Sequence, residues 1–450
     1  MTDATATSDP LGLLGGLIER VLKAGADAAD AVFVEGTSLS VAHRLGKPER
    51  LERSESADVG LRVFVGRRQA IVSSSDTGAT ALDELVDRAL AMARSVPEDE
   101  YCGLAESEVL AGDVPDLDLD DADEPSQETL AGWAAVAEDA ARAVSGVTNS
   151  EGAEAGWGRD AWALAASNGF SHAYGRSRCS VMASVLAGEG TAMERDYDYA
   201  TAVHAEDLRD PEEIGRAAGE RAVARLNAHK ATSAQVPVVY DRRVSGSLLG
   251  HLSRAIGGAA VARGTTFLKD KLGETIFPQS VTIVDDPQRQ RGLRSRPFDG
   301  EGIGTRPIDV VKDGVLGTWI LDLRSARQLK LVSTGHASRG VSSPPSPSTS
   351  NLYLEPGDVS PATLIADIKS GFMVTELIGM SLNTFTGDYS RGAVGFWIED
   401  GAIAYPVSEV TIAGNVIDMF TRISAADDLE FRYGVDAPTL RVDGMTVAGR

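Results

Sequence analysis

The stretch from Glu98 to Glu124 constrains the fold most, because it carries twelve acidic side chains and no basic one. Like charges at this density repel one another and leave too little apolar surface for a core. Asp118, Asp120 and Asp123 superficially have the spacing of a calcium loop, but the glycine and the closing glutamate of such a loop are missing. We therefore expect residues 98–124 to be an extended, solvated linker and the preferred site of proteolytic cleavage.

The linker separates a first folded segment, residues 1–97, from a second, residues 125–235, and a third, residues 236–450. In the first segment, apolar residues at helical spacing predict a helix near each end, with strands and turns at Val59-Gly60 and Val65-Gly66 between them. The second shows long strands between two helices, predicted over 130–144 and 211–226, which favours an antiparallel sheet. In the third, an apolar helix over 246–262 precedes many short strands separated by glycine and proline, which is typical of a sandwich or barrel. The predicted fold class is α+β and multidomain: a small N-terminal α/β module, a central antiparallel sheet with helices, and a β-rich C-terminal domain.

Composition excludes several classes of protein. The formal net charge of −23 argues against nucleic acid as a partner, because phosphate contacts need clustered Lys and Arg. No apolar run reaches the roughly 18 residues that cross a bilayer, and residues 1–10 show no signal peptide. Cys102 and Cys179 are the only cysteines, which excludes a disulfide scaffold and fits a reducing compartment. We expect a cytoplasmic protein without membrane contact.

The six histidines form no recognisable site. None has a second His or a Cys at the spacing of zinc ligands, and His-Glu-x-x-His is absent. The chain also lacks a P-loop and the Gly-x-Ser-x-Gly nucleophile motif. Gly300, Gly302 and Gly304 form a cluster that we interpret as a turn, because no strand–turn–helix pattern surrounds it. From the residues alone, the chain offers no convincing active site.

Several blocks of the third segment nevertheless carry a resemblance to a known family. They are LLGHLSRAIGGAAVARGTTFL from Leu248 to Leu268, DGEG from Asp299 to Gly302, STGHASR from Ser333 to Arg339, NLYLEPG from Asn351 to Gly357, GAVGFWIE from Gly392 to Glu399 with Pro406-Val407, and TLRVDGMTVAG from Thr439 to Gly449. In this order they resemble the TldD/PmbA family. The first two segments fit the same architecture.

Within that family, the TldD branch is a metallopeptidase whose helix carries His-Glu-x-x-x-His, with a further cysteine ligand near the C-terminus. Its Glu would serve as general base for a metal-bound water. With Arg263-Gly264-Thr265 as the anchor, the three motif positions fall on Leu249, Gly250 and Arg254. None of these can bind zinc, and no cysteine follows Cys179. The chain therefore resembles the PmbA (TldE) branch, a pseudoenzyme subunit with no metal and no cofactor of its own, zinc being expected only in the partner.

The resemblance implies a TldD-type metallopeptidase subunit as partner, a TldD–TldE heterodimer, and a peptide substrate such as an unfolded or leader peptide. Alone, the chain is expected to show no peptidase activity, and a homodimer in the absence of the partner stays open. Its β-rich domain would help to form a chamber and hold an extended peptide by its main chain. The candidate residues for peptide contact are His336, Arg339, Asn351 and Tyr353.

Two alternatives stay open at this point. The family has been associated with modulation of DNA gyrase, so one alternative is a non-enzymatic acidic protein that regulates a basic partner. The other is a hydrolase with an unrecognised site, such as His336 with Ser333 or Ser338. The sequence identifies no acid that would orient this histidine.

Overall fold

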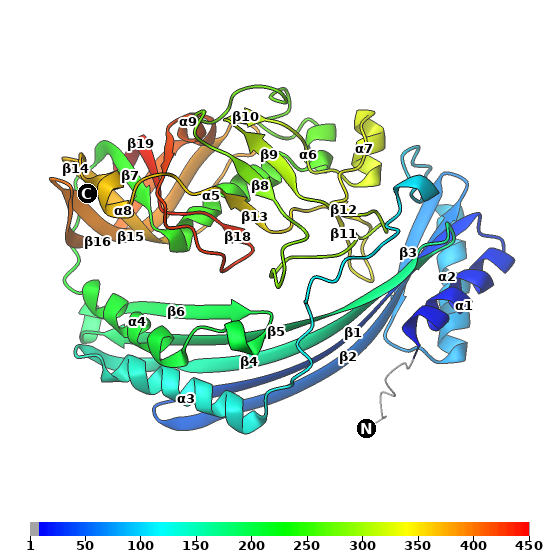
Figure 1. Cartoon of the computed structure of the whole chain (residues 1–450), viewed down its shortest axis with the longest axis horizontal. Coiled ribbons are helices and arrows are strands. Elements are labelled where there is room, and N and C mark those ends of the chain that lie inside the picture. Colours follow the sequence, from blue (N-terminus) through cyan, green and yellow to red (C-terminus); the bar gives the residue numbers. More distant parts are fainter. Residues whose placement is uncertain (1–8, 450) are drawn as a thin grey trace.

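Residues 9–449 are described in the computed structural model, in which a β-rich half lies on the concave side of a long, curved sheet (Figure 1). The prediction about a signal peptide concerns residues 1–10, and residues 1–8 lie outside the described range. Within the described range, no helix has both the length and the apolar character needed to span a membrane.

The first two predicted segments share one sheet. Their elements are α1 (Pro10–Lys23), β1 (Ala28–Arg44), β2 (Lys47–Val65), β3 (Arg68–Ser74), α2 (Ala79–Ser95), η1 (Ser107–Val109), α3 (Gln127–Ala143), β4 (Val147–Ala166), β5 (Ser171–Ala187), η2 (Gly190–Ala192), β6 (Glu194–Ala202), η3 (Ala205–Asp207) and α4 (Pro211–Ala224). The antiparallel strand order is β3-β2-β1-β4-β5-β6, and β1 pairs with β4 from Asp30 opposite Ala166 to His43 opposite Ala153. The N-terminal module is therefore part of a larger sheet and is not closed on itself.

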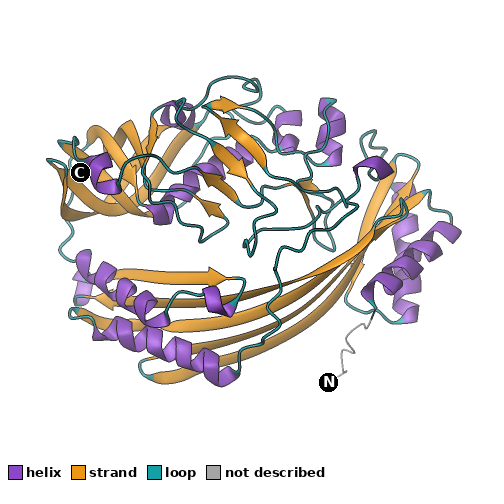
Figure 2. Cartoon of the chain, viewed as in Figure 1, coloured by secondary structure: helices purple, strands orange, loops and turns teal. Residues whose placement is uncertain are grey.

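Alternation along β1 gives the sheet two different faces. Its odd-numbered residues pack under helices: Ala31 and Phe33 belong to the core with α1 and α2, and Leu39 and Val41 belong to the core with α3 and α4. On the other face, Val32 joins an apolar cluster with Phe298 of the third segment. All four long helices of this half thus cover one face of the sheet, and the opposite face is left for the third segment (Figure 2).

The turn predicted at Val65-Gly66 is confirmed, whereas the turn predicted at Val59-Gly60 is wrong. Gly60 lies inside β2, and the chain reverses at Gly66, where φ is +57°. A side chain at Gly60 would place its Cβ 1.9 Å from the carbonyl oxygen of Val341 in the third segment. The glycine is therefore required by the close approach of another part of the backbone, which the local sequence does not reveal.

The acidic segment, residues 98–124, is extended as expected, with the short η1 as its one regular element. It is not a solvated linker, however. Leu117 and Leu119 are buried, and the Leu119 carbonyl accepts a hydrogen bond from the backbone N–H of Ser177 in β5. Arg159 and Arg291 pair with acidic side chains of the segment. Basic residues elsewhere in the chain supply the countercharge that the segment itself lacks.

The third segment contains a five-stranded barrel and a second sheet. Its elements are β7 (Ala234–Tyr240), α5 (Arg242–Ala255), α6 (Gly258–Ala262), β8 (Ile283–Asp285), β9 (Ile308–Lys312), β10 (Val315–Leu316), α7 (Leu323–Leu329), β11 (Ala337–Ser338), β12 (Ser346–Pro347), β13 (Leu352–Leu354), α8 (Pro361–Ile365), β14 (Ser370–Ile378), β15 (Asp388–Glu399), β16 (Ala402–Asn415), α9 (Val416–Thr421), β17 (Ile423–Ala425), β18 (Val435–Asp436) and β19 (Leu440–Ala448). Strands β16-β15-β14-β7-β19 close into a barrel because β19 also pairs with β16, and β17 extends this sheet beyond β19. The second sheet has the order β10-β9-β8-β13-β18. The α+β, multidomain fold class is confirmed.

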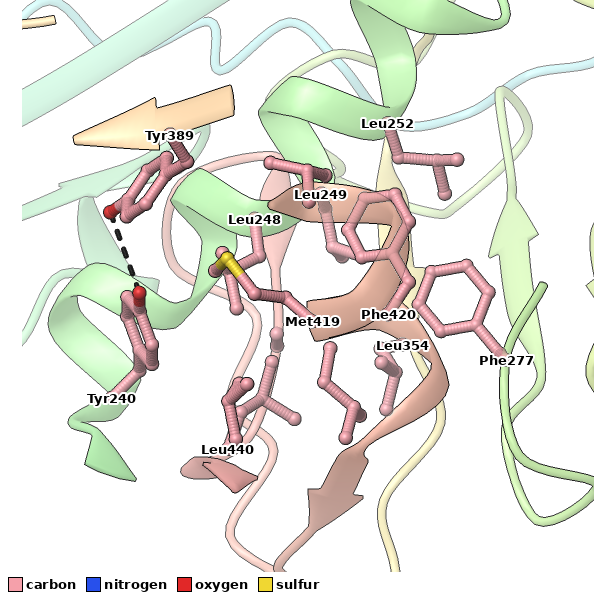
Figure 3. Packing of buried hydrophobic residues seen from close by; sticks show 14 of the residues in the cluster. Tyr240, Leu248, Leu249, Leu252, Phe277, Leu354, Tyr389, Met419, Phe420 and Leu440 are labelled. Carbon is pink, nitrogen blue, oxygen red and sulfur yellow. Dashed lines mark hydrogen bonds between the residues drawn. The ribbon is translucent and has the colours of Figure 1, made fainter. Parts of the chain in front are cut away.

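The apolar helix predicted over 246–262 is divided into α5 and α6. The break at Gly257 brings the next residue, Gly258, against α7: a Cβ on Gly258 would lie 2.4 Å from the Ser325 hydroxyl. Helix α5 lies against the core of this half, where Leu248, Leu249 and Leu252 lie among residues that include Phe420 (Figure 3). Because one face is buried so completely, only the opposite face of α5 is available to a ligand.

Candidate functional site

Helix α5 carries the three positions of the degenerate metal motif, and its open face lines a cleft of about 550 Å³. The helix begins at Asp241, whose carboxylate accepts a hydrogen bond from the Arg243 N–H at 2.9 Å. The cleft is bounded by α5, by β6 of the curved sheet and by parts of the barrel. The lining residues that matter below are Arg243, Ser247, Gly250 and Arg254 of α5, Tyr197 and Tyr199 of β6, Arg391 of β15, and Arg294, Glu376 and Tyr433.

The donor set at the motif does not fit a metal ion. Leu249 is 1% exposed and belongs to the core. Gly250 faces the cleft, and a Cβ there would have no atom within 4 Å. Arg254 lies at the same cleft and carries a positive charge. Within residues 9–449, no three His, Cys, Asp or Glu side chains come together in a way that could hold a metal.

His251 follows Gly250 on α5 but does not line the cleft. It is 6% exposed, stacks edge-on against Tyr389 with ring centroids 5.6 Å apart, and its Nε2 is buried without a hydrogen-bond partner. Burial lowers the pKa of His251 to about 4, and the charges of Arg391 and Arg254 act in the same direction. The imidazole is therefore neutral at pH 7 and lies in a positive potential.

The charges around the cleft are unbalanced. Arg243 pairs with Asp196 at 2.9 Å, and Glu376 pairs with Arg225 at 2.6 Å. The remaining three arginines of the lining form no ion pair within residues 9–449; they are Arg254, Arg294 and Arg391. The Nε of Arg391 is in addition buried without a hydrogen-bond partner. In a chain of net charge −23 this is a concentration of unpaired positive charge.

Two of the four residues expected to contact peptide are held inside the protein. His336 is 0% exposed; its Nε2 lies 3.0 Å from the Asp285 carboxylate, and its Nδ1 lies 2.8 Å from the Thr334 carbonyl oxygen. The Arg339 side chain is also 0% exposed and donates to Asp30 of β1 at 2.6 Å. Arg339 thereby joins the two halves of the molecule, whereas the contacts of His336 lie within the third segment.

Asn351 and Tyr353 are likewise engaged within the chain. The Asn351 amide is buried and donates to the Asp286 carbonyl oxygen and the Ser295 hydroxyl. The Tyr353 ring stands edge-on to Phe431 with centroids 5.0 Å apart. The structure thus places none of the four candidates at the cleft over α5, and peptide contact by any of them stays a prediction.

The hydrolase alternative has an acid–histidine pair but no nucleophile. Asp285 is the acid that the sequence did not identify. However, it accepts hydrogen bonds from Ser350, and both nitrogens of His336 are already engaged. The Ser333 hydroxyl donates to the Leu321 carbonyl oxygen, 3.2 Å away. Neither geometry nor burial therefore supports a nucleophile–base pair here.

A second cleft, of about 460 Å³, adjoins the first, since Arg294 and Thr349 line both. Its wall on the curved sheet is aromatic: Trp162 and Tyr174 have ring centroids 5.7 Å apart. Local sequence patterns do not reveal these aromatic residues, or Arg294 and Arg391, because the residues come from separate segments and each is ordinary in its own stretch. Only the pairing of distant strands brings them together.

Family models and individual relatives of the chain agree on one family. Models of the PmbA/TldA metallopeptidase family match three stretches of the chain: domain 1 at residues 29–93, the central domain at residues 120–226 and the C-terminal domain at residues 233–449. The metalloprotease PmbA of Escherichia coli O157:H7 is 38% identical over 94% of this chain and 93% of its own length. A PmbA homologue of Haemophilus influenzae is 34% identical over 96% of this chain and 94% of its own length.

Solved structures show the same fold. A protein of Bacteroides thetaiotaomicron, described as a candidate modulator of DNA gyrase, superposes with a TM-score of 0.91 at 28% identity, covering 99% of this chain and 100% of the other. The TldE protein of Thermococcus kodakarensis superposes with a TM-score of 0.87 at 21% identity, covering 97% of this chain and 100% of the other.

Proposed function

The chain belongs to the PmbA/TldA metallopeptidase family, and from this premise we propose that it is the metal-free, PmbA/TldE-type subunit of a TldD–TldE heterodimeric metallopeptidase that acts on unfolded or leader peptides. In this role it contributes part of the chamber and of the peptide-binding surface, while a TldD-type partner holds the zinc. The working compartment is the cytoplasm, in keeping with two free cysteines.

One observation carries this proposal: the motif positions on α5 are a core leucine, a glycine with empty space beside it, and a cleft-facing arginine. A zinc site needs three protein ligands and a base that can take a proton from water. Arg254 instead supplies a permanent positive charge, and the neighbouring His251 is buried beside the core. The fold of the peptidase family is kept, while the motif positions on α5 carry no group that would activate water.

The acidic-regulator alternative finds less support. The acidic side chains that would mimic a polyanion include Asp118, Asp120 and Asp99, and these pair with Arg291, Arg159 and Arg324 of the same chain. Pairing within the chain reduces what these three carboxylates offer to a basic partner. Modulation of DNA gyrase is therefore not the function that we propose.

We expect the purified chain to contain no stoichiometric zinc and to cleave no peptide, because it lacks ligands and base. Adding a TldD-type subunit that carries His-Glu-x-x-x-His should give a zinc-containing complex with peptidase activity above that of either protein alone. Elemental analysis, size-exclusion chromatography and a quenched-fluorescence peptide assay measure the three quantities. The partner subunit with its motif glutamate changed to glutamine is the control for contaminating proteases.

Two results would contradict the proposal. The first is about one zinc per chain in the unmixed protein, retained after dialysis. The second is peptide cleavage by the unmixed protein that a metal chelator abolishes. A mixture that elutes as one complex but stays inactive with several unrelated peptides would also count against a peptidase role.

A further inference from the structure

The cleft over α5 contains three guanidinium groups without an internal counter-ion. Arg254 comes from the last turn of α5, Arg294 from the loop after β8, and Arg391 from β15. Three separate parts of the fold therefore deliver positive charge to one hollow. The three like charges repel one another, and a bound anion that contacts all three arginines would relieve this repulsion.

The cleft also holds polar atoms whose hydrogen bonds are not made within the protein. The Ser247 hydroxyl and the Arg391 Nε are both buried and have no partner within residues 9–449. Ser247 and Gly250 lie one turn apart on the face of α5 that lines the cleft, and Gly250 leaves the space between them open. Buried polar groups in folded proteins are normally satisfied, so unsatisfied ones beside an open hollow indicate a missing acceptor.

The opposite wall suits a peptide better than a phosphate-rich polymer. Tyr197, Tyr199 and Tyr433 line the cleft, with Tyr199 and Tyr433 centroids 5.1 Å apart, and the adjoining cleft continues the aromatic surface with Trp162 and Tyr174. The volume of about 550 Å³ takes the end of a chain or a few residues and no folded domain. A planar guanidinium fork matches a carboxylate or a phosphate. On an unmodified peptide, that acceptor is a carboxylate.

We propose that the cleft over α5 binds a carboxylate group of the peptide substrate, with Arg254, Arg294 and Arg391 as its cationic contacts. The carboxylate comes from the C-terminus of the peptide or from an acidic side chain. This inference rests on the proposed function and deepens it, because it assigns a substrate class to the metal-free subunit. The cleft at the degenerate metal motif thus selects and orients peptide by charge.

Binding to the intact chain alone, without partner, tests the inference. Three fluorescently labelled peptides of alanine and serine serve as probes: one with a free C-terminal carboxylate, one with a C-terminal amide, and one amidated peptide with a single internal glutamate. We expect at least one carboxylate-bearing peptide to bind about tenfold more tightly than the neutral amide, as measured by fluorescence anisotropy. Which of the two gains affinity identifies the source of the carboxylate.

The variants Arg254→Gln and Arg294→Gln should each remove most of that tenfold difference. Arg216→Gln is the matched control, because Arg216 is exposed on α4 and lines neither cleft. His251 supplies a second readout that needs no affinity change. A bound carboxylate offsets the charges of Arg391 and Arg254, so the pKa of the imidazole, measured by NMR, should rise towards its usual range.

The inference is overturned if the neutral amide binds as tightly as both carboxylate-bearing peptides, or if all three fail to bind. It is also overturned if the tenfold difference survives in Arg254→Gln and Arg294→Gln proteins that melt at the wild-type temperature. Any of these results leaves the proposed function standing as long as the mixed subunits still cleave peptide. Loss of cleavage in the mixture, by contrast, concerns the proposed function alone.

Discussion

Two buried carboxyl groups, Asp299 and Glu301, lie in the turn around Gly300 and Gly302. Asp299 accepts hydrogen bonds from three backbone N–H groups, those of Glu301, Ile303 and Ala337. Glu301 accepts one, from Leu323 at the start of α7. Burial raises the pKa of Glu301 to about 8, and the nearby Asp299 carboxylate acts in the same direction. At neutral pH, Glu301 is therefore largely protonated in the folded protein.

The raised pKa of Glu301 in the folded protein predicts how the free energy of unfolding depends on pH. Between pH 4.5 and about pH 8 the folded protein keeps a proton on Glu301 that the unfolded chain releases, so this residue lowers the stability as pH rises through that window. Glu301→Gln keeps an acceptor for Leu323 and cannot ionise. We expect the variant to be more stable at pH 8 by on the order of 2 kcal/mol, and to have a flatter pH dependence.

Urea unfolding followed by circular dichroism at pH 5 and pH 8 measures the effect. Glu84→Gln is the control, since Glu84 is exposed on α2. A Glu301→Gln protein whose stability changes with pH as steeply as that of the wild type would show that the Glu301 carboxyl is ionised in the fold.

Among the elements, the acidic segment depends most on contacts outside itself. Arg291 connects it to the curved sheet by pairing with Asp118 at 2.6 Å and with Asp207 at 3.0 Å. The backbone N–H of Arg291 also donates a hydrogen bond to the Leu117 carbonyl oxygen. The side-chain contacts are partly exposed and therefore sensitive to salt, whereas the burial of Leu117 and Leu119 is not.

Removing this connection should release the segment. We expect Arg291→Ala to raise the rate at which a protease specific for acidic residues cuts within residues 98–124 several-fold, because the backbone must leave the surface to be cleaved. In the wild type, raising the salt concentration should act in the same direction. Mass spectrometry of the earliest fragments locates the cuts, and Arg216→Ala is the control. First cuts outside the segment in both proteins would contradict the prediction.

Of the elements, the sequence predicts those whose start and end are marked by residues within the element itself. The helix predicted over 211–226 matches α4 within two residues, because Pro211 and a capping aspartate mark its start. The family motif likewise identifies Leu249, Gly250 and Arg254 as positions without metal ligands. In contrast, Gly60 and Arg391 depend on residues that are distant in sequence, and no local pattern specifies which distant segment will pack against them.

In the whole molecule, the first two segments are held together by the sheet that they share, although the sequence divides the chain into three segments. β1 and β4 are in register over fourteen residue pairs, and the Arg339–Asp30 ion pair joins β1 to the third segment. The acidic segment that connects the first two parts therefore adds little to their association. The backbone could be interrupted there without losing the sheet.

We expect a chain cut at an engineered protease site between Gly112 and Asp113 to remain one particle. Residues 1–112 should co-elute with residues 113–450 on size-exclusion chromatography, and the two should separate only in urea. The uncut protein with the same inserted site is the control. Separation in native buffer would mean that residues 1–97 form an independent domain.

The distance along the chain between β1 and β4 has a consequence during translation. Asp30 pairs with Ala166, more than a hundred residues later. Since ribosomes add roughly 5–20 residues per second, β1 waits on the order of ten seconds for its neighbour. The stretch made in that interval includes the acidic segment. Completion of the first sheet is therefore timed by synthesis of the second segment.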